Sequence, residues 1–290
     1  MSVLDVRAVV KSYGPKRAVD GVSVRVEKGE VFGLLGPNGA GKTSLIRMIM
    51  DITRPDSGEI LLFDAPIRPE TKHRLGYLPE ERGLYQKQRV FDILAFLGRL
   101  KGLAPHVAAA RAEKYLDRVG LLEAKKKRMR ELSKGMQQKV QIAAVLLHEP
   151  DLLIMDEPFS GLDPVNRMLI IDIMKECTAR GTSLVLSTHL MDQVEALCAR
   201  VFLIHRGREV LSGSVREIKE QFADNAIFLE TDRDLRSHAS VVNGEGSKVW
   251  LRPGTNPEQF MADLISSGAK IRRFERALPS MDEIFVKVVS

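Results

Sequence analysis

Two short stretches of this chain combine residue types that suit the chemistry of nucleotide phosphates. The first is GPNGAGKT at residues 36–43, which directly follows the apolar run VFGLL and opens the helical pattern TSLIRMIM. Glycines allow backbone N–H groups to turn inward around a polyphosphate, and the N-terminus of the next helix adds a partial positive charge. Lys42 can reach the β- and γ-phosphates, and the Thr43 hydroxyl can ligate Mg²⁺. The residues predicted to bind ATP here are Gly36, Pro37, Asn38, Gly39, Ala40, Gly41, Lys42, Thr43 and Ser44.

The second stretch is LLIMDEP at residues 152–158, where two carboxylates end an apolar run. Asp156 occupies the position of a carboxylate that holds Mg²⁺ or its water ligands. Glu157 can accept a proton from the attacking water. A solvated turn before Pro158 is the alternative, and the presence of GPNGAGKT in the same chain weakens it. The two stretches together predict hydrolysis of ATP, with Lys42 and Glu157 as catalytic residues.

A third stretch, LSKGMQQ at residues 132–138, raises the question of which anion it binds. A Ser and a Gly just before an apolar pattern of helical spacing are typical of a helix N-terminus, which is a favourable place for an anion. No phosphate loop lies beside this stretch in the chain, so these residues alone leave the anion open.

The apolar pattern predicts an α/β fold that would position the three stretches. Residues 22–26 alternate with period two, as in a half-buried antiparallel strand. Continuous apolar runs at residues 31–35, 151–155 and 182–187 suit strands buried on both faces of a parallel sheet. Helical patterns separate the runs, at residues 42–50, 90–101, 107–119, 135–147, 165–178 and 191–197, and Gly207 marks a hairpin between residues 201–205 and 208–211.

The character of the sequence changes after Phe222, and two domains are expected, at residues 1–222 and 223–290. The second part has two strand-like pieces around a Gly-rich turn. A helix at residues 257–267, a strand at 270–274 and an amphipathic helix at 280–288 follow. These patterns predict a small α+β domain without a convergent set of catalytic residue types, and Trp250 is interpreted as a core residue.

The composition indicates a globular protein with an excess of positive charge. The formal net charge is +6, no apolar run is long enough to cross a bilayer, and Asp5 and Arg7 argue against a signal peptide. Cys177 and Cys198 are too few for a disulfide framework, so a cytosolic protein is expected. Part of the charge is concentrated in KKKRMR at residues 125–130. This run is interpreted as a solvated helix end, with contact to phosphate headgroups or to nucleic acid as alternatives, and the lack of interleaved aromatic residues weakens the nucleic-acid case.

Five motifs in a fixed order resemble those of the ATP-binding subunit of an ABC transporter. GPNGAGKT, LSKGMQQ, LLIMDEP, SGLD and STH are all present, and the resemblance covers about residues 3–220. Agreement of five motifs is far more specific than any one of them. The resemblance implies a P-loop NTPase cassette of the ABC type, with a RecA-like core, an antiparallel β subdomain and a helical subdomain, followed here by the small C-terminal α+β domain.

The resemblance also implies roles for further residues. Tyr13 would stack on adenine, Asp163 belongs to the SGLD loop, and His189 would be a catalytic residue in contact with the γ-phosphate. In this family two cassettes meet head to tail, so that the phosphate loop of one faces the signature helix of the other. The anion at Ser133 and Gly135 would then be the γ-phosphate of an ATP held by a second copy of the chain or by a homologous subunit. ATP binding would close this dimer, and hydrolysis would reopen it.

The sequence departs from the family pattern at two motifs. Lys134 and Met136 stand where the signature usually has Gly and Gln, and Lys134 is expected to point to solvent. Glu80 in LGYLPEERGLY stands where the family usually has Gln. An ionised Glu only accepts hydrogen bonds, so Glu80 is expected to orient water or to ligate Mg²⁺ together with Thr43 and Asp156. The wording LPEERGLY and the C-terminal pattern SMDEIFVKVV resemble the branch that contains sodium-efflux and drug-resistance exporters.

The function expected from the resemblance is that of an ATP-hydrolysing motor subunit of a membrane exporter, with ATP and Mg²⁺ as cofactors. A separate integral-membrane subunit would be its partner and would hold the chain at the cytoplasmic face of the membrane. Residues 81–95 would face this partner, with Tyr85, Val90 and Phe91 as candidates for a groove that receives a short helix. Substrate specificity would lie in the membrane subunit.

Two other functions compete with this expectation. A soluble ABC ATPase acting on nucleic acid or ribosomes is one, but such proteins usually carry two cassettes or a long coiled coil, and this chain has one cassette and no sustained heptads. A small-molecule phosphotransferase is the other, and it would not need LSKGMQQ or SGLD. No nucleic-acid partner is expected.

Overall fold

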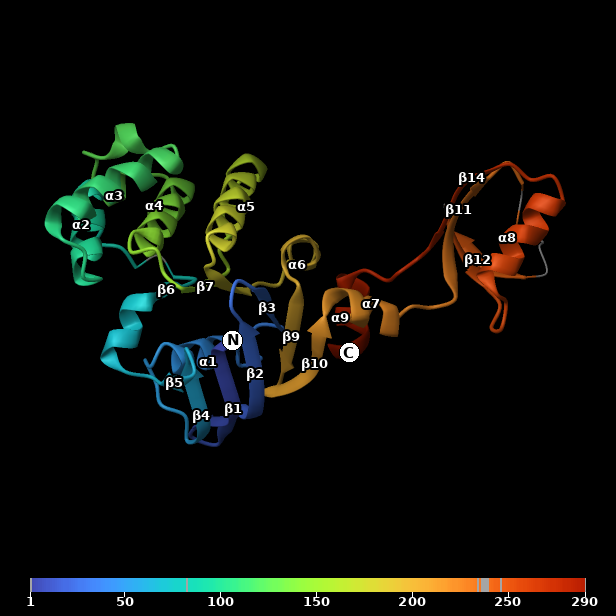
Figure 1. The fold of residues 1–290 in the computed structure, drawn as a ribbon, viewed down its shortest axis with the longest axis horizontal. Helices are drawn as coiled ribbons and strands as arrows, with labels where there is room; N and C mark the ends of the chain where they lie inside the picture. The colour runs from blue at the N-terminus through green and yellow to red at the C-terminus, as the bar shows by residue number, and fades with distance from the viewer. Residues whose placement is uncertain (1, 82, 234, 236–239, 246, 290) are drawn as a thin grey trace. The chain divides into compact units, whose positions relative to one another are not determined.

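The computed structural model describes residues 2–81, 83–233, 235, 240–245 and 247–289. The chain divides into two compact units, Met1–Gly213 and Ser214–Ser290 (Figure 1). This division falls before the boundary expected at residue 222, because the short helix α7 (Val215–Gln221) packs against α9 (Met281–Val289) within the second unit. Helix α7 was not predicted, although the capping box of Ser214 and Glu217 was a signal for it.

A six-stranded sheet with the order β10-β9-β3-β8-β7-β6 forms the centre of the first unit. Strand β3 pairs in parallel with β8 and β9, and β7 pairs in parallel with β6 and β8. The three strands predicted from continuous apolar runs are confirmed, as is the hairpin at Gly207. The strands are β3 (Val31–Leu35), β6 (Leu75–Leu78), β7 (Leu152–Asp156), β8 (Ser183–Ser187), β9 (Arg200–His205) and β10 (Arg208–Ser214).

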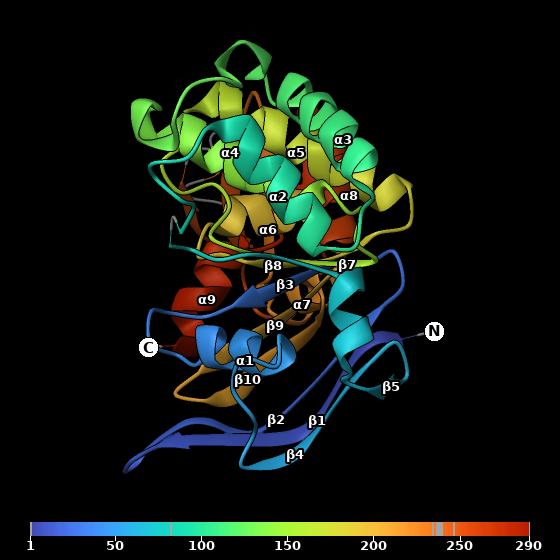
Figure 2. The same cartoon turned by 90° about the vertical axis from the view of Figure 1, so that its left-hand side faces the viewer.

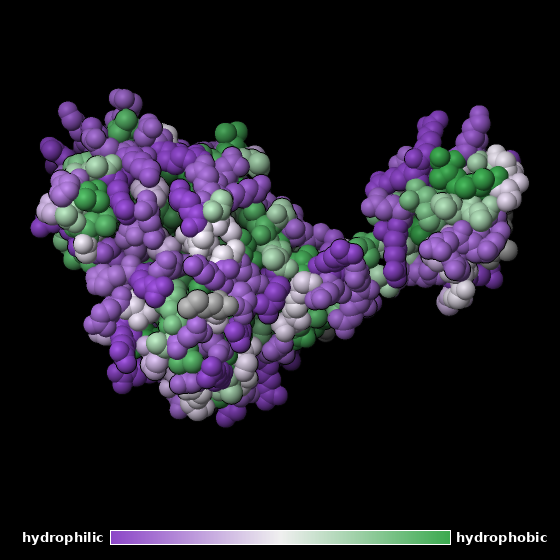
Figure 3. Space-filling model, in the orientation of Figure 1, coloured by the Kyte–Doolittle hydropathy of each residue, from purple (hydrophilic) through white to green (hydrophobic). Residues whose placement is uncertain are grey.

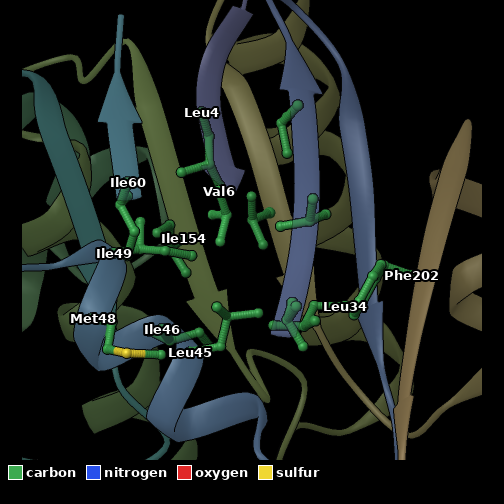
Figure 4. Close-up of a cluster of buried hydrophobic side chains, with 14 of the residues drawn as sticks. Leu4, Val6, Leu34, Leu45, Ile46, Met48, Ile49, Ile60, Ile154 and Phe202 are labelled. Carbon is green, nitrogen blue, oxygen red and sulfur yellow. The ribbon is translucent and has the colours of Figure 1, made fainter. Parts of the chain in front are cut away.

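An antiparallel sheet with the order β2-β1-β4-β5 is the second layer of this unit. Figure 2 shows helix α1 (Lys42–Ile49) between the two sheets. In the core between them, Leu45 and Ile49 of α1 lie in one cluster with Val6 of the antiparallel sheet and Ile154 of the parallel sheet (Figure 4). This packing fixes the orientation of α1 and of the loop before it. The strands are β1 (Ser2–Tyr13), β2 (Lys16–Glu27), β4 (Ser57–Leu62) and β5 (Ala65–Pro66).

Helices α2, α3, α4 and α5 gather on one side of the six-stranded sheet (Figures 1 and 2). Helix α2 packs against α3 and α4 through apolar faces, which matches their helical patterns in the sequence. All six helices predicted for residues 42–197 are confirmed. Those not yet given are α2 (Val90–Leu100), α3 (Pro105–Arg118), α4 (Lys134–Leu146), α5 (Pro164–Ala179) and α6 (Met191–Leu197), and the short 3₁₀ helices are η1 (Pro69–Arg74), η2 (Leu122–Ala124) and η3 (Met129–Glu131).

The described residues of the second unit form an antiparallel sheet with the order β12-β13-β11-β14 and three helices. Its core contains Ile227, Leu251 and Phe260. Trp250 is only half-buried, contrary to expectation, because the alternate residues Val249 and Leu251 of its strand face the core instead. The remaining elements are β11 (Ala226–Thr231), β12 (Val241–Glu245), β13 (Lys248–Leu251), α8 (Pro257–Ser266) and β14 (Ile271–Arg276).

Across the described ranges of the chain, no helix has both the length and the apolar character that a membrane span requires.

Candidate active site

The predicted functional stretches meet at the carboxyl edge of the six-stranded sheet. The neighbouring strands β3, β8, β7 and β6 lead, in this order, to the phosphate loop (residues 36–43), His189, the pair Asp156 and Glu157, and Glu80. Parallel strands bring their carboxyl ends to the same edge, and α/β folds bind ligands there. Residues that are far apart in the sequence are therefore brought together.

The phosphate loop makes a tight turn between β3 and α1. Gly36 and Gly41 have φ angles of 149° and 122°, and a Cβ atom on them would lie 2.2 Å from the carbonyl oxygen of Ile204 and 2.4 Å from that of Ala18. A residue with a side chain does not fit at either position. Helix α1 begins at Lys42, and no side chain of the described residues caps its N-terminus. Its first N–H groups therefore remain available to an anion.

Lys42 is held inside the phosphate loop. Its Nζ donates hydrogen bonds to the carbonyl oxygens of Gly36 and Pro37, at 2.6 Å and 3.3 Å, and the residue is only 7% exposed. Burial lowers the pKa of the Lys42 ammonium, while the carboxylates of Glu157, Asp156 and Glu80 act in the opposite direction. The buried ammonium group of Lys42 is therefore well placed to replace its hydrogen bonds to these carbonyl oxygens with contacts to a phosphate.

One pocket contains most of the residues predicted to bind ATP. Its volume is ≈ 470 Å³. Lys16 and Ala18 of β2 also line it, although neither was predicted; an exposed Lys after a hairpin turn has no sequence signal of its own, and only the pairing of β1 with β2 places it beside Tyr13. The predicted residues in the lining are Tyr13, Asn38, Gly39, Ala40, Gly41, Lys42, Thr43, Ser44, Glu80, Asp156 and Glu157.

Asp156 is buried in this pocket, with 3% of its surface exposed. Burial raises the pKa of its carboxyl group, and the nearby carboxylates of Glu80 and Glu157 raise it further. Thr43, Asp156 and Glu80 offer oxygen atoms within one pocket, and oxygen is the ligand type that Mg²⁺ prefers. The part of the chain that the structure describes contains no group of three or more His, Cys, Asp or Glu side chains arranged for a metal ion. Mg²⁺ at these residues would therefore need water and phosphate oxygens to complete its coordination.

The carboxylate of Glu157 is oriented by two residues that follow strand β8, Thr188 and His189. Its Oε1 lies 2.8 Å from Nδ1 of His189, and its Oε2 accepts a hydrogen bond of 3.5 Å from the hydroxyl of Thr188. The φ angle of Glu157 is 49°, a conformation rare for a residue with a side chain, and its N–H donates to the carbonyl of Ser187 at 2.8 Å. Strain of this kind concentrates at functional sites. The side chain of Glu157 is 11% exposed and that of His189 is 63% exposed.

The signature residues Ser133 and Gly135 do not line this pocket. Ser133 caps helix α4, and its hydroxyl oxygen accepts a 3.3 Å hydrogen bond from the N–H of Met136. A Cβ atom on Gly135 would lie 3.6 Å from the carbonyl oxygen of Gly161, so the start of α4 borders the SGLD loop. Asp163 in that loop caps α5 and is also outside the pocket lining.

Two buried glutamines connect helix α4 to the active site, and neither was predicted. Nε2 of Gln138 donates to the carbonyl oxygen of Pro158 at 3.2 Å, directly after Glu157. Nε2 of Gln141 donates to the carbonyl oxygen of Glu81 at 3.3 Å, directly after Glu80. A Gln on a helix is usually exposed, so the sequence pattern carries no sign of these contacts.

A second pocket of the first unit is mainly apolar and has a volume of ≈ 350 Å³. We call it the apolar groove; it lies between β6 and helices α2 and α4 and is lined by Met50, Tyr77, Leu78, Pro79, Gly83, Leu84, Leu97, Leu100, Lys101, Gln141, Ala144, Val145 and His148. None of the expected groove residues Tyr85, Val90 and Phe91 lines it. Val90 is fully buried at the start of α2, whereas Tyr85 is exposed and packs edge-to-face on Phe96 with ring centroids 6.5 Å apart.

Lys134 and the described histidines other than His189 differ in their exposure to solvent. Lys134 is exposed, as expected. His148 is mostly buried, and its Nε2 lies 2.9 Å from the carbonyl oxygen of Leu75. A single His without partners at useful spacing is predicted to be a surface or packing residue; His73 and His106 are exposed and His205 is half-buried. His238, for which the same prediction holds, lies outside the described residues.

Comparisons with known proteins agree with this geometry. Residues 19–160 match the model of the family described as ABC transporter, and residues 213–289 match that of the C-terminal domain of DrrA1-3-like ATP-binding proteins. The uncharacterized ABC transporter ATP-binding protein YhaQ of Bacillus subtilis is 38% identical over 99% of this chain and 98% of its own length. The Nod factor export ATP-binding protein I of Burkholderia pseudomallei is 38% identical over 98% of this chain and 96% of its own length.

A solved structure of an ATP-binding subunit of an ABC transporter has a TM-score of 0.72 to this chain, with 32% identity, and the match covers 76% of this chain and 93% of the other. The similarity thus extends from the motifs to the complete fold of the first unit. The relatives match over nearly their whole length, which excludes a chance agreement of short motifs. On these grounds the chain belongs to the ATP-binding proteins of ABC transporters, the cassette ATPases that bind ATP and couple its hydrolysis to transport.

Proposed function

We propose that this chain is the motor subunit of a membrane exporter and that it works as a head-to-tail dimer closed by ATP. The observation that carries the proposal is the separation of Ser133 and Gly135 from the pocket that contains the phosphate loop, Asp156 and Glu157. A helix N-terminus with a free hydroxyl donor is an anion site. A second cassette, turned head to tail, would bring its own ATP phosphates to Ser133 and Gly135.

The residues of the pocket can divide the chemistry between them. Lys42 and the N–H groups of the phosphate loop would hold the β- and γ-phosphates, and Tyr13 would stack on the adenine ring. Thr43, Asp156 and Glu80 would hold Mg²⁺, which neutralises charge on the phosphates when it is bound.

Glu157 would take the proton from the attacking water, and His189 would position the γ-phosphate and keep Glu157 oriented. The ATP site would be completed across the dimer interface. The phosphate loop would lie on one face of this interface, and Ser133, Gly135 and Asp163 would lie on the other. A closed arrangement with twofold symmetry needs two copies of this chain, or one copy and a homologous subunit, because each contributes one phosphate loop and one signature.

The hydrogen bonds of Gln138 and Gln141 give a route from ATP to the rest of the protein. They join α4, which carries the signature, to the segments that follow Glu157 and Glu80. A change at the γ-phosphate would therefore displace α4 and the helices packed on it together.

The apolar groove is the proposed contact with a membrane-spanning subunit. It combines an apolar lining with Lys101 and with the buried amide of Gln141, whose Oε1 has no partner in the described part of the chain. A short amphipathic helix with one polar side chain would satisfy both properties. The chain would thus lie at the inner face of the membrane through its partner. The relative named for Nod factor export supports transport in the outward direction.

The two parts of the chain have different proposed roles. Residues 1–222 would be the ATP-binding cassette, and residues 223–290 would be an accessory domain. The second part contains none of the residues assigned above to ATP or Mg²⁺.

Sedimentation of the purified Glu157→Gln variant tests the dimer. With the base removed, ATP and Mg²⁺ should convert monomer to dimer, and adding Ser133→Arg should abolish the conversion while ATP binding persists. Ser57→Arg, at an exposed position of β4, is the matched control and should leave the dimer intact. If Glu157→Gln binds ATP but stays monomeric, both alone and combined with Ser133→Arg or Ser57→Arg, the proposal is contradicted for the isolated subunit.

The membrane contact is tested by a charge in the apolar groove. Leu100 lines the groove and is 60% exposed, so Leu100→Glu should fold normally and lose an integral-membrane protein that co-purifies with the parent chain. Ile52 is 59% exposed and outside the groove lining, so Ile52→Glu should retain that protein. Equal retention by both variants would show that the groove is not the contact.

A further inference from the structure

Two segments of the first unit that lie side by side carry a dense set of cations. Residues 86–90 run antiparallel to residues 127–130, because Arg89 pairs with Arg128 in a β-bridge. The N–H of Val90 donates to the carbonyl of Lys127 at 2.9 Å, and the N–H of Met129 donates to that of Gln88 at 3.0 Å. We call the cations of this region the basic ladder: Lys87, Arg89, Lys126, Lys127, Arg128 and Arg130.

The basic ladder has few counter-charges. All six side chains are exposed, and no ion pair involves any of them within the described ranges. Lys125, the first cation of the KKKRMR run, differs because its Nζ pairs with Glu113 at 2.7 Å. Within the described residues, the carboxylate of Glu131 accepts a 2.5 Å hydrogen bond from the backbone N–H of Arg128, and no ion pair joins it to a side chain of the ladder. Unlike Lys125, these six cations are therefore available to an external anion.

The bridge places two like charges against each other. Arg89 and Arg128 are directly opposite in an antiparallel pair, which puts their Cβ atoms about 4.5–5.5 Å apart and on the same side of the ribbon. Like charges in such a pair are destabilising. A fold that keeps a local conflict of this kind usually does so at a functional position. An anion that contacts both guanidinium groups would remove the repulsion.

The surroundings of the ladder indicate what kind of anion this is. Gly83 and Leu84 line the apolar groove, and Lys87 follows Leu84 by three residues, so the two Cα atoms are at most about 11 Å apart. In the sequence, Tyr85 lies between a groove residue and a ladder residue, and so does Phe96. The two side chains are 59% and 45% exposed and pack on each other. Over α2 and α3 the molecular surface is mainly hydrophilic, with small apolar patches (Figure 3). Exposed aromatic rings beside a group of Lys and Arg are typical of a surface that meets the headgroup layer of a membrane.

We propose that the basic ladder binds the phosphate groups of anionic lipids at the inner face of the membrane. The proposal rests on the placement of the chain beside a membrane-spanning subunit, since the apolar groove borders the ladder. Nucleic acid fits less well, because no aromatic side chain stands between the cations of either segment to stack on a base. The lipid contact would orient the cassette on its partner and would add to the affinity that the groove supplies.

The direct test is binding of the full chain to vesicles. The chain should bind vesicles of phosphatidylcholine mixed with phosphatidylglycerol, should not bind phosphatidylcholine alone, and should be released at high salt. Each cation near such a surface contributes about a fivefold change in binding. The double variant Lys126→Gln with Lys127→Gln should therefore bind about 25-fold more weakly. Lys28→Gln with Lys175→Gln removes the same net charge from exposed positions elsewhere in the first unit, and it should bind nearly as well as the parent.

The pair Arg89 and Arg128 provides a second test, which distinguishes a role in lipid binding from a purely structural role. Arg128→Glu converts a like-charged pair into an oppositely charged one. It should raise the thermal midpoint of unfolding and at the same time weaken vesicle binding by more than Arg128→Gln does. A loss of binding accompanied by a lower midpoint would mean that the variant is misfolded, and the Lys126 and Lys127 variant then decides the question.

Two results would overturn the proposal. One is equal vesicle binding by the ladder variant and its matched control. The other is a ladder variant that binds vesicles normally but loses affinity for random-sequence DNA, which would assign the surface to nucleic acid. Sedimentation with ATP keeps this test separate from the proposed motor function. The Lys126 and Lys127 variant, combined with Glu157→Gln, should still form the ATP-dependent dimer, so that loss of lipid binding and loss of the dimer are distinguishable failures.

Discussion

Nδ1 of His189 lies 2.8 Å from Oε1 of Glu157, although 32 residues separate them in the sequence. The contact follows from the sheet order, because β7 and β8 are neighbours and the two residues lie just beyond their carboxyl ends. In this arrangement the carboxylate proposed as the base is already hydrogen-bonded. As the proposed base, Glu157 would have to share or leave this bond when it takes a proton from water, so His189 would control the orientation of the base as well as contacting the γ-phosphate.

Replacing Glu157 by Gln should stop turnover and leave nucleotide binding intact. The amide has nearly the same shape as the carboxylate but cannot accept the proton, and loss of a general base costs about 10²–10⁴-fold in rate. Release of phosphate and equilibrium binding of ATP, measured on the same preparation, check both parts. Glu123→Gln, a change of an exposed acid outside the pocket, is the control and should hydrolyse ATP at the parent rate. A Glu157→Gln variant with more than about a tenth of the parent rate would rule out Glu157 as the base.

Replacing Asp156 by Asn should stabilise the nucleotide-free chain against unfolding and should weaken its ATPase activity. Burial raises the pKa of Asp156, so the folded chain resists ionisation of this group more than the unfolded chain does. The free energy of unfolding contributed by Asp156 therefore falls as the pH rises from the unfolded pKa to the raised folded pKa. The variant should unfold at a higher temperature than the parent at neutral pH, and the difference should disappear in acid. A difference that is the same at every pH would show that the effect does not come from ionisation.

Removing the charge of Lys16 should weaken ATP binding modestly. Lys16 lines the pocket beside Tyr13 but is exposed, so an ion pair between its ammonium and a phosphate would contribute up to about 1 kcal/mol, or about fivefold in affinity. Titration of Lys16→Ala with ATP at low and high salt measures this, and the deficit should shrink at high salt. Lys28→Ala, at an exposed position near the other end of β2, should bind ATP like the parent. Unchanged affinity in Lys16→Ala would place this ammonium outside the nucleotide contacts.

His148 should make the first unit less stable in moderate acid. Burial lowers the pKa of His148 from 6.5 to about 4, so the unfolded chain takes up the proton first as the pH falls. Stability from this group is fully present above pH 6.5 and is lost down to pH 4, by up to about 3 kcal/mol. Urea unfolding at several pH values should show this slope in the parent and in His106→Gln, whose side chain is exposed. The slope should be much smaller in His148→Gln, and an unchanged slope in that variant would assign it to another group.

The sequence by itself determined the elements and the chemical groups of the active site. Phosphate-loop glycines, the carboxylates of Asp156 and Glu157, and the helices and strands of residues 22–211 other than β4, β5 and β6 follow from patterns that span at most about twenty residues. Such patterns are local, since helical and extended backbones repeat every 3.6 and 2 residues and glycine alone tolerates the turn before α1. Because the motifs are local patterns, they can be recognised without knowing the order of the strands in the sheet.

Only the tertiary structure decided which distant segments meet. It placed Lys16 in the nucleotide pocket, buried Val90, turned Trp250 away from the core, joined Gln138 to Pro158 and set residues 86–90 against residues 127–130. Each of these facts depends on the register between two strands or on the packing of a helix against a segment far away in the chain. A one-residue change of register would reverse the direction of every side chain in a strand, and no local pattern encodes that choice.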